Sequence, residues 1–312
     1  MRTIAPANLL TADIDEHADE PLTASRAIGA GRFSLQLHPS RADWCAVEDW
    51  TAAEGWDPGF GDAQAVTALD PGALVIGLLE GTPVSAISVL RISGLYAVLG
   101  NYLVHRGYRG RGFGLATWRA ALPHAGGRVI ALDAVPDRVG TYEGAGFTTA
   151  HTTIGYHGTV RAGRTRSQPR VRPLESGDRT AIVALDAACS PFERSAFLAV
   201  WIAANSTRTL VYQEPGGEIT GFGAIRPSRC GYRIGPLVAQ HEQAAAALFD
   251  ALTAPHAGEQ VVVNCPEPNA AGCDLARERG LFRASHTVRM YSHPVRPAAL
   301  THSYSTASLA WG

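Results

Sequence analysis

Glycine and arginine alternate in one short stretch of the chain, Arg109-Gly-Arg-Gly-Phe-Gly114. Glycine lets backbone N–H groups approach an anion closely, and the two arginines add full positive charge. An apolar run over residues 96–104 predicts a strand before this loop. After it, Leu115, Trp118 and Leu122 recur as one side of a helix would. The N-terminus of that helix adds partial positive charge, so the whole arrangement suits a pyrophosphate.

Composition excludes several other functions for this loop and for the chain. The 312 residues contain 27 basic side chains, all of them Arg. Without Lys, neither a Walker-type phosphate loop nor Schiff-base chemistry is possible, and the dinucleotide fingerprint G-x-G-x-x-G is not met in its usual context. A net charge of −1 argues against an electrostatic nucleic-acid binder.

The sequence shows no clear membrane span, secretion signal or metal-binding motif. No apolar run approaches the roughly 18 residues of a membrane span, and residues 1–20 do not resemble a secretory signal. The five cysteines show no C-x-x-C spacing, and the 11 histidines show no ligand spacing. We expect a cytoplasmic protein that needs no metal and has neither a nucleic-acid nor a membrane partner.

The order of elements repeats along the chain. Gly81 and Gly217, like Gly146 and Gly280, lie about 135 residues apart, which predicts a duplicated unit. Each copy reads helix, antiparallel strands, helix, strand, helix, strand, an α+β order with two mixed, mostly antiparallel sheets flanked by helices. The predicted divisions are a mobile arm (1–32), a first unit (33–160), a linker (161–172), a second unit (173–294) and a short, loosely ordered tail (295–312).

Two motifs carry a family resemblance. Arg109–Gly114 matches the R/Q-x-x-G-x-G/A loop of the GCN5-related N-acetyltransferases (GNATs), and Tyr142–Phe147 matches their Y-x-x-x-G-F. The chain thus resembles a tandem GNAT fold over residues 33–294. Five further segments are similar to the YitH-type two-domain acyltransferases: Glu54–Gly59, Leu132–Pro136, Tyr232–Leu237, Pro266–Asn269 and Arg289–Tyr291.

The resemblance implies roles for individual residues. The backbone of Leu103 and Val104 would take the pantetheine and the thioester carbonyl of an acyl-CoA, which is most simply acetyl-CoA. Tyr142 would protonate the departing CoA thiolate. The pyrophosphate would lie on the loop residues Arg109, Gly110, Arg111, Gly112, Phe113, Gly114 and Leu115.

No motif identifies the group that takes the proton of an attacking amine. Asp133, at a strand end, is the first candidate, followed by Asp57, Glu54 and His105, although each also has an ordinary reading as a cap or a solvated side chain. Trp56 and Asp57 are expected to line the acceptor pocket. The family's usual Asn at the start of the helix with Tyr142 is absent, which leaves one cofactor contact unassigned.

The second copy lacks the features of the first. The counterpart of the glycine loop falls near Val238–Ala244, which contains neither Gly nor Arg, and the counterpart of Tyr142 falls near Ala276. We therefore expect only the first unit to bind acyl-CoA, while the second unit shapes the acceptor cleft.

The predicted function is an acetyl-CoA-dependent N-acyltransferase that acts on a small-molecule amine by direct attack, as a monomer or weak homodimer. One alternative is a GNAT-fold sensor or scaffold that binds CoA esters without transfer. Another is a GNAT-fold enzyme with different chemistry, such as decarboxylation.

Overall fold

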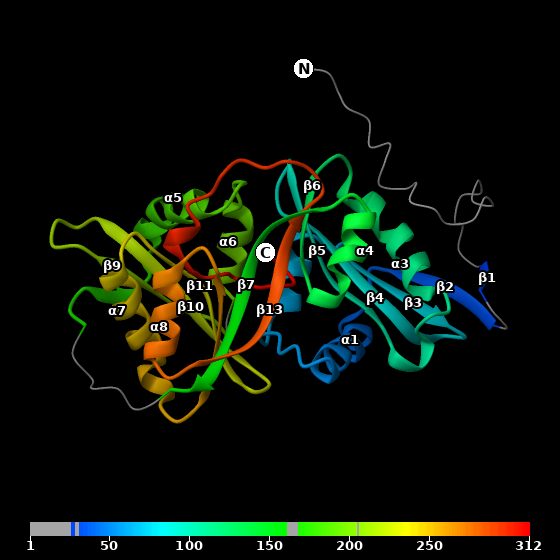
Figure 1. Cartoon of the computed structure of the whole chain (residues 1–312), viewed down its shortest axis with the longest axis horizontal. Coiled ribbons are helices and arrows are strands. Elements are labelled where there is room, and N and C mark those ends of the chain that lie inside the picture. Colours follow the sequence, from blue (N-terminus) through cyan, green and yellow to red (C-terminus); the bar gives the residue numbers. More distant parts are fainter. Residues whose placement is uncertain (1–25, 29–30, 161–167, 205) are drawn as a thin grey trace, which may run out of the picture.

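The computed structural model describes residues 26–28, 31–160, 168–204 and 206–312 (Figure 1). Most of the predicted mobile arm and residues 161–167 of the predicted linker lie outside this range. Within it, short strands already occupy Arg26–Ile28 and the start of Gly31–Leu37, so the end of the arm is part of the sheet. Residues Val171–Pro173, at the end of the predicted linker, also form a strand.

The first half contains seven strands and four α-helices among its described residues. The strands are β1 (Arg26–Ile28), β2 (Gly31–Leu37), β3 (Leu74–Leu79), β4 (Thr82–Arg91), β5 (Tyr96–Val104), β6 (Val129–Ala134) and β7 (Thr148–Thr159). The helices are α1 (Arg41–Ala53), α2 (Asp62–Leu69), α3 (Phe113–Ala121) and α4 (Val139–Gly144).

The second half repeats this order and ends in an additional strand. Its strands are β8 (Val171–Pro173), β9 (Arg208–Gln213), β10 (Ile219–Ser228), β11 (Gly231–Ala239), β12 (Gln260–Pro266), β13 (Phe282–Tyr291) and β14 (Ser303–Ser305). Its helices are α5 (Arg179–Cys189), α6 (Ser195–Ile202), α7 (Glu242–Thr253) and α8 (Ala270–Glu278).

Local signals explain why the two halves match. Gly81 and Gly217 both adopt positive φ, 79° and 93°, at equivalent hairpin turns. Gly146 and Gly280 do the same, at 89° and 83°, after α4 and α8. Left-handed backbone favours glycine, so these residues mark the repeated turns. Helix α1 begins after Ser40, its N-cap, in a capping box with Asp43.

The two units exchange their last strands. Strand β13 of the second unit pairs antiparallel with β6 of the first and also with β7, while β7 pairs with β12 of the second unit. Figure 1 shows β7 and β13 side by side at the centre of the molecule. The result is one continuous 14-stranded sheet in the order β1-β2-β3-β4-β5-β6-β13-β7-β12-β11-β10-β9-β8, with β14 on β11.

This exchange refines the predicted architecture. The tandem arrangement of mixed, mostly antiparallel strands flanked by helices is confirmed, but the two sheets are joined into one. Strand periodicity shows which residues face the core and does not show which strand is the neighbour, so the sequence could not reveal the exchange. The described residues include no helix long and apolar enough to cross a membrane.

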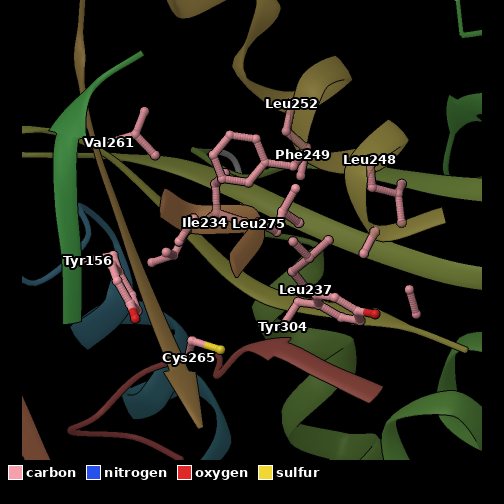
Figure 2. Close-up of a cluster of buried hydrophobic side chains, with 14 of the residues drawn as sticks. Tyr156, Ile234, Leu237, Leu248, Phe249, Leu252, Val261, Cys265, Leu275 and Tyr304 are labelled. Atoms are coloured by element: carbon pink, nitrogen blue, oxygen red, sulfur yellow. The ribbon is translucent and has the colours of Figure 1, made fainter. Parts of the chain in front are cut away.

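Apolar side chains of the exchanged strand complete the core of the second unit. Figure 2 shows Leu248, Phe249 and Leu252 of α7 above the sheet, with Tyr156 of β7 and Tyr304 of β14 in the same cluster. All five are buried. The core of the second unit therefore depends on a strand of the first and on the end of the chain.

The C-terminal segment is packed, and the expectation of a loosely ordered tail is wrong. Trp311 is only 2% exposed and lies 6.2 Å from the ring of Trp44. The polar composition of the tail reflects its contacts: the Ser305 hydroxyl accepts from the N–H of Asn264 and donates to the carbonyl of Ile234. Serine here satisfies backbone groups of β11 and β12, which makes a polar sequence compatible with burial.

A buried ion pair between α2 and β10 joins the two units. Arg226 of β10 donates to both carboxylate oxygens of Asp62 in α2, at 2.6 and 3.0 Å, and both side chains are less than 5% exposed. The guanidinium also lies 4.5 Å from the ring of Trp201. A Cβ at Gly59 would meet Arg226 Nε at 2.3 Å, so a glycine is needed beside this pair.

Replacing Arg226 tests how much this pair contributes. We expect Arg226→Ala to lower the free energy of unfolding by about 3–5 kcal/mol, because Asp62 would be left charged and buried. The matched control is Arg277→Ala, which removes an exposed pair with Asp274 and should cost less than about 1 kcal/mol. Urea unfolding measures both, and equal losses in the two variants would contradict the account.

Candidate active site

A cavity of about 920 Å³ opens where β5 leaves β6. The two strands pair in parallel only over Tyr96–Val98 and Val129–Ala131. Beyond that point the cavity is bounded by β5, the glycine loop, α4, the α1–α2 loop, strands of the second unit and the end of the chain. Its lining includes all of the predicted site residues except His105: Glu54, Trp56, Asp57, Leu103, Val104, Arg109, Gly110, Arg111, Gly112, Phe113, Gly114, Leu115, Asp133 and Tyr142.

A bulge in β5 produces the divergence. Asn101 has a φ of 49°, and the pairing of β4 with β5 shifts register between Ala86 and Ser88. The Asn101 amide donates to the Ser88 hydroxyl at 3.2 Å, which holds the bulge. Because a bulge bends its strand, β5 turns away from β6, and Leu103 and Val104 do not pair with β6.

The glycine loop leaves the start of α3 open. Gly110 and Gly112 have φ of 73° and 82°, and Gly112 caps α3 with no side-chain hydrogen bond. The first N–H groups of α3 therefore point outward without an intrahelical partner, as an anion site requires. A Cβ at Gly114 would lie 2.7 Å from Val104 Cγ2 and 2.9 Å from Tyr102 Oη, so only glycine lets α3 begin this close to β5.

The two loop arginines behave differently. Arg109 donates to Glu54 Oε1 at 2.6 Å and to the Val104 carbonyl at 3.0 Å, which ties the loop to the end of α1 and to β5. Burial acts to raise the pKa of Glu54, but hydrogen bonds from Arg106 and Arg109 outweigh it and hold the pKa below its ordinary value. Arg111 pairs with no carboxylate of the described residues and lies over two aromatic rings.

Tyr142 lies on the cavity wall in α4. Its ring packs 5.9 Å from Trp118 and 6.0 Å from Phe147. Burial raises the pKa of Tyr142 well above its usual range, so the phenol is protonated at neutral pH. Its hydroxyl bonds no other described residue, which leaves the proton available to a group in the cavity.

Asp133 brings only its backbone to the cavity. Its side chain has no exposed surface, and Arg289 Nη2 of β13 donates to Oδ2 at 2.5 Å. The Thr287 hydroxyl adds a long hydrogen bond of 3.4 Å to Oδ1. Burial raises the pKa of Asp133, and the charge of Arg289 opposes that rise.

The other predicted proton acceptors either form hydrogen bonds within the protein or lie outside the cavity. The Asp57 carboxylate accepts hydrogen bonds from the turn of β10 and β11, through Ser228 Oγ at 2.6 Å and the N–H of Arg229 at 3.0 Å. Glu54 holds the loop arginine. His105 lies against Trp50 and does not line the cavity.

Several cavity residues were missed because they come from the second unit, from the exchanged strand β7 or from the end of the chain. His157, Arg233, Asn264 and Ser285 reach the cavity through the exchanged and neighbouring strands. Ser308–Ala310 cover another part of it, close enough to β5 that a Cβ at Gly100 would lie 2.1 Å from the Ala310 carbonyl. Of these residues, only Arg233 could have been noticed in the sequence, because it is a charged residue beside the apolar residues of its strand.

The equivalent opening in the second unit is filled. Strands β11 and β12 also pair in parallel only at their start, over Tyr232–Ile234 and Val261–Val263. Strand β14 then occupies the opening between them through its pairing with β11 and the Ser305 contacts. At the start of α7, His241 Nδ1 accepts from the N–H of Ala244, so the helix is capped by its own side chain.

No group of three or more His, Cys, Asp or Glu side chains in the described part of the chain could hold a metal ion.

Comparison with known proteins identifies relatives for both halves. Residues 36–147 match the model of the acetyltransferase (GNAT) family, and residues 182–305 match that of an acetyltransferase (GNAT) domain. The holothin acyltransferase of Pseudoalteromonas sp. (strain SANK 73390) is 29% identical over 256 residues, which cover 81% of this chain and 85% of that protein.

Solved structures share the fold. A proposed acetyltransferase from Pyrococcus horikoshii has a TM-score of 0.74 at 20% identity, over 96% of this chain and 100% of the other. A tandem GNAT protein from the clavulanic acid biosynthesis pathway, solved without acetyl-CoA, has a TM-score of 0.58 at 15% identity, over 84% and 98% of the two chains.

Substitution of Gly114 tests the contact between α3 and β5. We expect Gly114→Ala to weaken acyl-CoA binding about tenfold or more, equivalent to about 1.4 kcal/mol, because the added methyl pushes the start of α3 away from β5. Gly127→Ala is the control, since a Cβ there meets no atom within 4 Å. Calorimetric titration with acetyl-CoA compares the two variants, and unchanged binding by Gly114→Ala would overturn this view of the loop.

Proposed function

Because the chain belongs to the GNAT acyltransferases, with one domain of that family in each half, we propose that it transfers the acyl group of acetyl-CoA to the amine of a small molecule. The observation that carries the proposal is one cavity lined together by the glycine loop, the β5 backbone and Tyr142. The relative named holothin acyltransferase supports acyl transfer, and holothin therefore belongs in a panel of amines to test.

The first unit supplies the donor site in this proposal. The open N–H groups of Phe113, Gly114 and Leu115, with Arg111 beside them, would hold the pyrophosphate. Arg109 would keep the loop in place through Glu54. The backbone of β5 beyond its bulge would hydrogen-bond the pantetheine and direct an N–H at the thioester carbonyl, where it stabilises the developing oxyanion.

Tyr142 would serve the leaving group. The amine nitrogen attacks the carbonyl carbon, the C–S bond breaks, and the phenol gives its proton to the CoA sulfur. Because burial raises the pKa of Tyr142, the phenol is protonated before the reaction begins and holds the proton that the thiolate needs. The product is an N-acyl amine and free CoA.

The attacking amine must also lose a proton. We do not assign this step to Asp133, because its carboxylate is buried in an ion pair with Arg289. Its proposed role is to hold Arg289 in position. Burial, and then the charge of Arg233, lower the pKa of His157 below its ordinary value of 6.5, which leaves a neutral imidazole in the cavity. His157, directly or through water, is therefore our proposed proton acceptor.

The second unit would act as a wall of the acceptor site and bind no cofactor of its own. Its filled opening and capped α7 support this division of roles. The exchange of strands within one chain favours a monomer. A cytoplasmic location stays a prediction of the sequence.

Replacing Tyr142 tests the proposed chemistry. With acetyl-CoA and an amine panel that includes holothin, we expect a product heavier by one acetyl group, detected by mass spectrometry. Tyr142→Phe should lower kcat by about 100-fold or more and leave acetyl-CoA binding nearly unchanged. The control is Tyr232→Phe, whose ring stacks on His256 outside the cavity.

Three outcomes would count against the proposal. An unchanged kcat in Tyr142→Phe would remove that residue from the reaction. Tight acetyl-CoA binding with no product from any amine would favour a sensor or scaffold. A product without an N-acyl group would indicate different chemistry on the CoA ester.

A further inference from the structure

We propose that the acceptor carries a carboxylate and that Arg233 binds it at the end of the cavity formed by the second unit. This inference deepens the proposed function and rests on it, because it names the chemical class of the amine. It concerns a residue to which neither family motif assigns a role.

The strand geometry aims Arg233 at the acceptor side of the cavity. Arg233 lies on β11 opposite Arg226 of β10 and Val262 of β12, so it shares a face of the sheet with Arg226. Arg226 contacts α2 on that face, which identifies it as the one covered by the α1–α2 loop. Arg233 Nη1 donates to the carbonyl of Asp57 in this loop at 2.7 Å.

Arg233 forms no ion pair within the described part of the chain, and the carboxylates of Asp57 and Asp62 act on its charge only from beyond ion-pair distance. Arg233 is partly buried, whereas two fully buried arginines of this region each pair with a carboxylate, Arg226 with Asp62 and Arg289 with Asp133. Among the described residues, no carboxylate oxygen lies within 4 Å of the guanidinium of Arg233, and Asp57 directs its own carboxylate to the turn at residues 228–230.

Burying a charge without a counter-ion is costly, which is why buried charges in proteins are almost always paired. Burial, and then the charge of Arg226, lower the pKa of Arg233 to about 10, so the side chain remains a cation at neutral pH. A bound anion would offset this cost. A guanidinium that faces a cavity offers a carboxylate two parallel N–H donors.

The neighbouring side chains are polar and add no negative charge. Gly155 of β7 lies opposite both Asn264 of β12 and Ser285 of β13. A Cβ at Gly155 would lie 2.4 Å from Ser285 Oγ and 3.5 Å from Asn264 Oδ1, so the glycine leaves room where these groups converge. Together with the imidazole of His157, they can accompany a carboxylate without repelling it.

Paired acceptors test the proposal through activity. Each amino acid in a panel is compared with its own carboxamide, which keeps the amine and removes the charge. The wild type should prefer the carboxylate by about tenfold or more in kcat/KM. Arg233→Gln should abolish the preference, and Arg233→Lys should keep part of it. Arg229→Gln, which removes an exposed pair with Asp49, should leave the preference unchanged.

A binding measurement separates this inference from the proposed function. At constant ionic strength, benzoate should raise the Tm of the wild type and of Arg229→Gln and leave that of Arg233→Gln unchanged. Equal shifts in all three proteins, or a shift with inorganic phosphate and none with benzoate, would overturn the carboxylate site. Absence of N-acyl product with every amine would contradict the proposed function, while the Tm shift would still report on Arg233.

Discussion

The pairing of β13 with both β6 and β7 is the constraint on which the rest of the structure depends. It places a strand of the second unit beside the first-unit strand that carries Asp133, and it places β7 of the first unit in the core of the second. Neither unit is complete alone. The exchange also makes the cavity composite, because Ser285 and Thr287 of β13, and Asn264 of β12, reach a site whose glycine loop belongs to the first unit.

The two units differ in what lies beside the backbone groups that separated parallel strands leave unpaired. In each, a parallel pair of strands separates after three residues and leaves backbone groups without partners. In the second unit, β14 pairs with β11, and Ser305 bonds backbone groups of both β11 and β12. In the first unit, the opening between β5 and β6 is part of the cavity. The duplicated fold thus has one opening that forms part of a cavity and one closed by its own chain.

Local chemistry made much of this predictable. Gly81 and Gly217, both with positive φ, mark the repeat, and the loop Arg109–Gly114 and Tyr142 from the two GNAT motifs line the cavity. Long-range pairing was not predictable. The partner of Asp133 is Arg289, more than 150 residues away, and no local pattern links them. The predicted loose order of the tail is wrong for a related reason. The tail has a polar sequence, and the groups that Ser305 and Trp311 contact lie far away along the chain.

Calorimetric titration with acetyl-CoA tests most directly the claim that one opening binds and the other is closed. The account predicts one acetyl-CoA per chain, with binding lost in an Arg109→Ala/Arg111→Ala double variant, because both arginines belong to the loop of the first unit. A stoichiometry of two, or a single site that survives in the double variant, would mean that the second unit binds the cofactor and would contradict the account.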